Sequence, residues 1–110
     1  MTRVKLERKG NIFSGYRYSI EADGHAADVH EDGSVTGSRE VCLAVSVILQ
    51  LVQTWLDWTD SEREITLESG KGRISFSGDK CDTLFEVACC GIRRLAETNP
   101  DCIQYEFTSH

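Results

Sequence analysis

Hydrophobic and polar residues alternate in five short stretches of the chain, which is the pattern of strands with one buried face. Lys9-Gly10-Asn11 separates the first two stretches and predicts a turn. Ser69-Gly70-Lys71-Gly72 separates the third and fourth and predicts a hairpin. The predicted strands cover residues 2–7, 16–21, 64–68, 73–77 and 102–107.

A longer apolar pattern at helical spacing covers residues 41–58 and predicts a helix, with Ser38 as its N-cap. This helix carries two apolar stripes, of which the first consists of Val41, Val45, Ile48, Leu49, Val52 and Leu56. We therefore expect it to be covered on more than one side, either between the sheet and the other helix or against a second subunit. The second stripe consists of Leu43, Val47, Leu51 and Trp55.

Two further segments complete the predicted order of elements. Thr83-Leu84-Phe85-Glu86 fits a capping box at the start of a second amphipathic helix, which Pro100 brings to an end. Residues 26–38 hold two glycines and several acidic residues but little hydrophobic pattern, so we expect a mobile loop. The order ββ-α-ββ-α-β predicts an α+β fold, with an antiparallel or mixed sheet of about five strands and two helices. A chain of 110 residues supports a single domain over 1–110.

Charge and composition exclude several classes of function. A net charge of −6 argues against a nucleic-acid partner, which requires clustered Lys and Arg. Polar residues interrupt the 41–58 segment, which therefore predicts a buried helix and no membrane partner. The five cysteines lack paired spacings, and no signal sequence precedes the first strand, so we expect reduced thiols and a cytoplasmic protein.

The candidate chemistry lies in one cysteine and one histidine. Cys42 falls in the predicted first turn of the 41–58 helix, where unpaired N–H groups and the helix dipole favour a thiolate. His25 follows the second predicted strand and could take the proton of that thiol. Alone, a cysteine here is more often a small buried residue, and a lone histidine is more often on the surface.

Other sites are less well supported by the sequence. The remaining cysteines lack the spacing of structural zinc ligands, which usually have about two to four residues between paired members. Cys89 and Cys90 are adjacent, whereas Cys81 and Cys102 are isolated, so we expect no metal site. No glycine-rich phosphate loop follows a strand, which argues against a nucleotide cofactor.

The two candidate residues lie in motifs that resemble a known family. Gly24-His25-Ala26, a glycine-bearing loop and Val41-Cys42-Leu43-Ala44-Val45-Ser46 together resemble the signature of the ribosomal-processing cysteine proteases (the Prp, or YsxB-like, family). The later order of hairpin, helix and final strand also fits, with Asn99-Pro100 at the last turn. The chain departs from the family pattern in a longer loop between the motifs. It also has Arg39-Glu40 where the family has Asp-Ile.

This resemblance implies a cysteine endopeptidase with a Cys/His dyad, in which Cys42 attacks the substrate and His25 moves the proton. It further implies no cofactor, a homodimer, and a protein substrate: the N-terminal extension of a large-subunit ribosomal protein, cut between Phe and Ala. Related phage proteins process capsid proteins, and the longer loop leaves that substrate open. The alternative is a non-catalytic ribosome-assembly or peptide-binding module with the same fold. We expect the substrate-binding residues to be Gly24, Ala26, Ser38 and Ser46.

Overall fold

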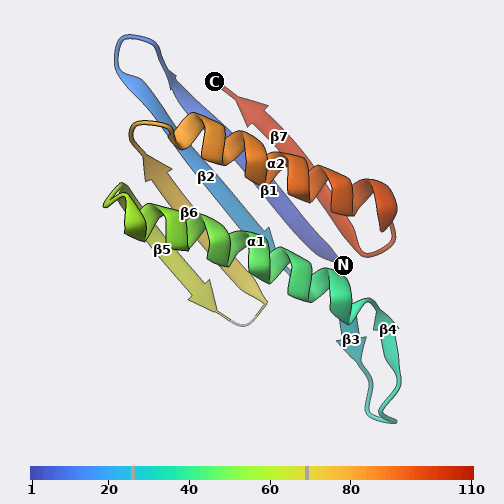
Figure 1. Ribbon diagram of the computed structural model, residues 1–110. Helices are drawn as coiled ribbons and strands as arrows, with labels where there is room; N and C mark the ends of the chain where they lie inside the picture. The colour runs from blue at the N-terminus through green and yellow to red at the C-terminus, as the bar shows by residue number, and fades with distance from the viewer. Residues whose placement is uncertain (26, 69) are drawn as a thin grey trace.

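The computed structural model describes residues 1–25, 27–68 and 70–110 of the chain and has two layers (Figure 1). Five strands form a mixed sheet in the order β5-β6-β2-β1-β7, and α1 and α2 lie across one face of it. Only β1 and β7 are parallel; the other neighbours are antiparallel. The predicted α+β fold is therefore confirmed. The elements are β1 (Thr2–Asn11), β2 (Gly15–Asp23), β3 (Ala27–Val29), β4 (Val35–Gly37), α1 (Arg39–Trp58), β5 (Glu62–Glu68), β6 (Lys71–Ser77), α2 (Cys81–Thr98) and β7 (Ile103–Ser109).

The register of the sheet explains why the alternating pattern predicted its strands correctly. Leu6 pairs with Ile20, and Ile20 pairs with Ile74, so three buried aliphatic residues form one row across β1, β2 and β6. Burying side chains of this size contributes about 1.5–3 kcal/mol each. A shift of one residue would move the whole row to the open face, so the apolar pattern fixes the register.

Helix α1 packs one face on the sheet, as the predicted spacing requires, and Ser38 is its N-cap. By length and composition α1 could also cross a membrane, but its first apolar stripe belongs to the core of the domain. The first alternative for the second stripe, cover between the sheet and the other helix, is wrong for Leu43, Val47 and Leu51, which are exposed, whereas Trp55 is half-buried against the core. The second alternative, a second subunit, stays a prediction. The buried residues of α1 are Val41, Val45, Leu49, Val52 and Leu56.

Three local predictions were wrong. The first turn lies at residues 12–14, because β1 continues to Asn11, whose side-chain oxygen accepts the N–H groups of Phe13 and Ser14. Helix α2 begins at Cys81, so Thr83 lies inside its first turn. The first backbone bond of α2 runs from Leu84 N–H to the Lys80 carbonyl.

The third wrong prediction is the loop expected over residues 26–38. Its described part contains the antiparallel hairpin β3–β4, which extends beyond the body at the end where α1 begins (Figure 1). Asp32 closes the turn of this hairpin, since its carboxylate accepts both the N–H and the hydroxyl of Ser34, at 2.9 and 2.6 Å. An Asp-Gly turn between two valines is a hairpin signal, which the sequence contains at Asp32-Gly33.

Candidate active site

A pocket of about 200 Å³ lies between the N-terminal half of α1 and the turn that joins β5 to β6. Its lining contains both predicted catalytic residues, although His25 follows β2 and Cys42 lies in α1. Gly24 and Ser46 line the same pocket. The inner wall is apolar, and Gln50, Glu68 and Lys71 add polar groups. The apolar lining consists of Ala22, Val45, Leu49, Leu67 and Gly72.

Cys42 is half-buried in the first turn of α1. The side chain of a helical residue leans toward the helix N-terminus, so we expect the thiol near the unpaired end of the helix. Two N–H groups of this turn are already used. Val41 donates to the Ser38 hydroxyl at 3.2 Å, and Cys42 donates to the Ser38 carbonyl at 3.3 Å. Within the described residues, the N–H groups of Arg39 and Glu40 donate to no acceptor, which leaves them available to a negative charge.

His25 follows the end of β2 and is held through its backbone. The Met1 nitrogen donates to the His25 carbonyl at 2.8 Å, and the hydroxyl of Thr2 donates to the Gly24 carbonyl at 3.4 Å. On the other side, Gly24 N–H donates to the Gly70 carbonyl at 2.8 Å. The peptide before His25 is therefore fixed between β1 and the β5–β6 turn. His25 as a residue is exposed to solvent.

The other predicted site residues have different positions. Ser46 is exposed and lines the pocket one turn after Cys42. Ser38 is the N-cap of α1 and lies outside the pocket lining, so its side chain serves the helix rather than the pocket. Ala26 lies outside the described residues. Sequence reasoning missed Thr2, Gly70 and Lys71, whose approach to His25 depends on strand pairing between distant segments.

Among the acidic residues between the two motifs, Asp32 has a defined role within the β3–β4 hairpin. Asp32 is engaged with Ser34, and these hydrogen bonds hold the pKa of its carboxyl below the usual range. That carboxylate therefore stabilises the β3–β4 turn.

The remaining thiols differ from Cys42 in their surroundings. Burial raises the pKa of the Cys89 thiol to about 12 and also raises the pKa of Cys81. Thiols with a raised pKa react slowly near neutral pH, because the thiolate is the nucleophile and little of it forms. Over the described parts of the chain, no three His, Cys, Asp or Glu side chains come together as a metal site would require.

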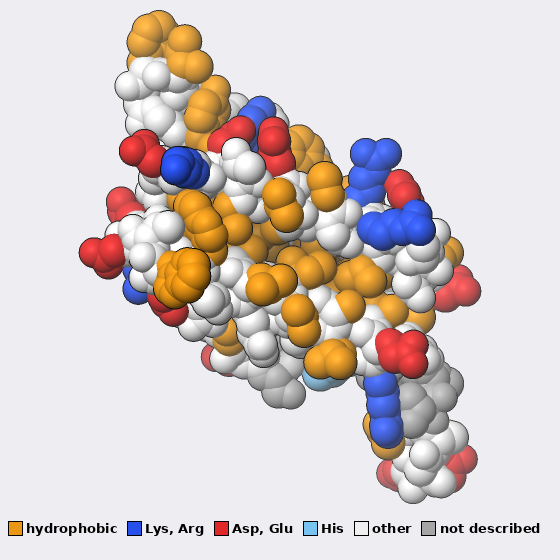
Figure 2. Space-filling view, in the orientation of Figure 1, with side chains coloured by type: hydrophobic (Ala, Val, Ile, Leu, Met, Phe, Trp, Pro, Cys, Tyr) orange, Lys and Arg blue, Asp and Glu red, His pale blue; other side chains and the backbone are white. Residues whose placement is uncertain are grey.

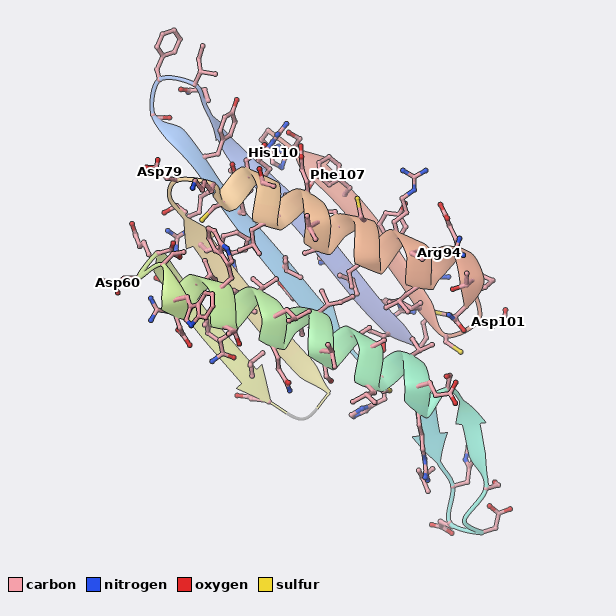
Figure 3. The ribbon with its side chains drawn as sticks, in the orientation of Figure 1. Asp60, Asp79, Arg94, Asp101, Phe107 and His110 are labelled. Carbon is pink, nitrogen blue, oxygen red and sulfur yellow. The ribbon has the colours of Figure 1, made fainter. Side chains whose placement is uncertain are left out.

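The opposite end of the molecule holds a second cavity, between the turn after α1 and the turn before α2. Figure 3 shows Asp60 and Asp79 at this end, far from the β3–β4 hairpin. No residue predicted for catalysis lines it. The candidate chemistry is therefore confined to the first pocket.

Comparison with known proteins places the chain in a family. The sequence profile of the family described as cysteine protease Prp matches residues 1–104. A search of curated proteins finds no match to the chain.

Solved structures share the fold. The ribosomal processing protease Prp of S. aureus, in complex with a substrate peptide, superposes with a TM-score of 0.72 at 15% identity, covering 98% of this chain and 100% of that one. SMU.848 from Streptococcus mutans gives 0.71 at 21% identity, covering 100% and 99%. The S. aureus protease with a covalently linked product peptide gives 0.68 at 16% identity, covering 96% and 99%. With a family profile matched over nearly its whole length, this chain belongs to the cysteine protease Prp family.

Proposed function

We propose that this protein is a cysteine endopeptidase in which Cys42 is the nucleophile and His25 is the general base and acid. The observation that carries the proposal is that both residues line one pocket, although they come from separate segments of the chain. The position of Cys42 in the first turn of α1 supports its role, because helix N-termini stabilise thiolates.

The reaction follows from these groups. His25 takes the thiol proton, and the Cys42 sulfur attacks the scissile carbonyl carbon to form a tetrahedral oxyanion. The intermediate collapses, the C–N bond breaks, and the imidazolium gives its proton to the leaving amine. A water molecule, deprotonated by His25, then hydrolyses the thioester and restores the thiol. The N–H groups of Arg39 and Glu40 are the candidates that would stabilise the oxyanion.

For the substrate we propose an extended peptide at the N-terminus of a large-subunit ribosomal protein, cut between Phe and Ala. The S. aureus relative is a ribosomal processing protease seen with substrate and product peptides, which supports this class of substrate. The apolar wall formed by Val45, Leu49 and Leu67 suits an apolar side chain beside the cut. A phage capsid precursor is the alternative substrate that the experiment must include.

The cleavage experiment uses the purified protein with two peptides, one carrying the Phe–Ala junction of the ribosomal extension and one from a capsid precursor. Product masses identify the cut. Cys42→Ala should abolish cleavage and keep the fold, because alanine is a good helix former. Cys102→Ala, which alters a half-buried thiol outside the pocket, should cleave normally. Cleavage by the Cys42→Ala protein would refute the protease assignment, whereas binding of a peptide without cleavage would favour a non-catalytic binding module.

The general-base role has its own test. His25→Ala should reduce cleavage strongly near neutral pH and less at alkaline pH, where the thiol ionises without a base. Unchanged activity near neutral pH would remove His25 from the mechanism.

We also propose a homodimer in the cytoplasm. Figure 2 shows hydrophobic side chains gathered over α1 and α2, and the exposed stripe of α1 supplies Leu43 and Leu51, which are 66% and 63% exposed. An apolar patch of this kind is typical of an interaction surface. The five cysteines form no disulfide with one another, which is usual in a reducing compartment.

A further inference from the structure

The imidazole of His25 lies against Gly70, a residue of the β5–β6 turn that has no side chain. A Cβ added at Gly70 would lie 2.6 Å from Nε2 of His25, 3.1 Å from Cε1 and 3.3 Å from Cδ2. The first distance is about 0.8 Å short of the 3.4 Å at which ordinary van der Waals contact begins. Any other residue at position 70 would therefore push the ring away.

Gly70 also holds the backbone that carries this ring. Its carbonyl accepts the Gly24 N–H at 2.8 Å, so one residue contacts both the peptide before His25 and the imidazole. The φ angle of Gly70 is +74°, in the left-handed region that glycine adopts without strain. This conformation lets the carbonyl of Gly70 meet Gly24 while its Cα faces the ring.

We propose that Gly70 is a positioning residue for His25. Contact with the Cα of Gly70, which carries no side chain, fixes the position of the imidazole in the pocket. The inference rests on the proposed role of His25 as the base for Cys42. A proton acceptor must stand within hydrogen-bond reach of the atom it serves, and a misplacement of about 1 Å can cost on the order of 10²-fold in rate. The β5–β6 turn, which also lines the pocket, thus helps to place the proton acceptor.

The test compares Gly70→Asn with Gly15→Asn. Asparagine tolerates the left-handed region better than other residues, so Gly70→Asn should fold and still place a Cβ against the ring. Gly15 is the matched control, since its φ is +83° and a Cβ there meets nothing within 4 Å. We expect Gly70→Asn to lower kcat by on the order of 10²-fold with little change in KM. Gly15→Asn should behave as the unmodified protein.

The pH dependence of Cys42 alkylation distinguishes a positioning role of Gly70 from a purely structural role. In Gly70→Asn this profile should shift to that of His25→Ala, whereas Gly15→Asn should keep the original profile. A folded Gly70→Asn protein with the original kcat and the original profile overturns the inference. If His25→Ala itself leaves cleavage unchanged, the base assignment fails instead, so the two failures are distinguishable.

A measurement on the unmodified protein keeps the inference testable if the position 70 variants do not fold. Nuclear Overhauser effects between the His25 ring protons and the Gly70 Hα protons should be strong in the free protein. Their absence would show that the ring does not contact Gly70 and would overturn the proposal.

Discussion

The backbone N–H of Gly24 donates a 2.8 Å hydrogen bond to the carbonyl oxygen of Gly70. This bond continues the pairing of β2 with β6 past the end of β2, to the residue directly before His25. On its other side, the same segment receives hydrogen bonds from Met1 and Thr2. A histidine just beyond a strand end is thereby held by two neighbouring strands rather than left on a free loop.

Gly24→Ala is expected to lower stability and activity together. Gly24 has a φ of +90°, and a Cβ there would collide with the carbonyl oxygen of Met1. The expected loss in the free energy of unfolding is about 1–3 kcal/mol, measured by urea denaturation. Gly33→Ala is the control for the backbone conformation alone, because its φ is +84° and a Cβ there meets nothing. Equal losses in both variants would contradict a specific collision at Gly24.

Cys42 is expected to be the thiol that iodoacetamide modifies fastest. Cys81 and Cys89 should react slowly at neutral pH, because burial raises the pKa of both thiols. Cys90 is exposed and is the main source of background labelling, so the measurement uses a Cys90→Ser protein. Mass spectrometry of peptides after short exposures gives the rate at each site. Uniformly slow labelling of all four remaining cysteines would favour the non-catalytic module.

Leu51→Glu is expected to convert a dimer to a monomer. Leu51 is exposed in the single chain, so the substitution should leave the folded subunit almost as stable as before. A charge placed in an apolar interface costs much more, since it loses its hydration. Light scattering coupled to gel filtration measures the mass, and Gln104→Glu adds the same charge at an exposed position of β7. A monomeric unmodified protein would exclude this interface.

Local sequence patterns were sufficient for the elements that make the core. The row of Leu6, Ile20 and Ile74 follows from alternation alone, since each residue must face the helices for its strand to be buried. The N-cap at Ser38 could also be predicted, because a cap depends on residues within one turn. The pairing of the two motifs in one pocket was predicted from their resemblance to a family.

Features that depend on distant partners could not be read in the same way. The contact between Gly70 and His25 exists only because β6 pairs with β2, and no local pattern near residue 70 indicates it. The start of α2 was misplaced for a similar reason. Cys81 is fully buried by tertiary packing, which extends the helix beyond the capping signal at Thr83.

The aromatic cluster beneath α2 predicts how stability depends on alkaline pH. Tyr18 packs against Phe76 and Phe85, with ring centroids 5.5 and 5.1 Å apart, and its hydroxyl donates to Asp82 at 3.0 Å. Burial, together with this hydrogen bond, raises the pKa of Tyr18 from 10.0 to about 12. Between these two values the unfolded chain has lost the proton while the folded chain keeps it. Stability contributed by Tyr18 is therefore complete below about pH 10 and falls as the pH rises toward 12.

Tyr18→Phe tests this dependence directly. Near pH 8 the variant should be less stable by about 1 kcal/mol, because it lacks the hydrogen bond to Asp82. Asp82 keeps its ion pair with Arg8, at 3.3 Å, so its carboxylate is not left alone. As the pH rises above 10, the unmodified protein should lose up to about 2–3 kcal/mol that the variant does not lose, so the difference shrinks and then reverses. Urea denaturation across this range measures both, with Tyr16→Phe as the control that should keep the original dependence. Parallel curves for Tyr18→Phe and the unmodified protein would show that the Tyr18 proton is not linked to folding.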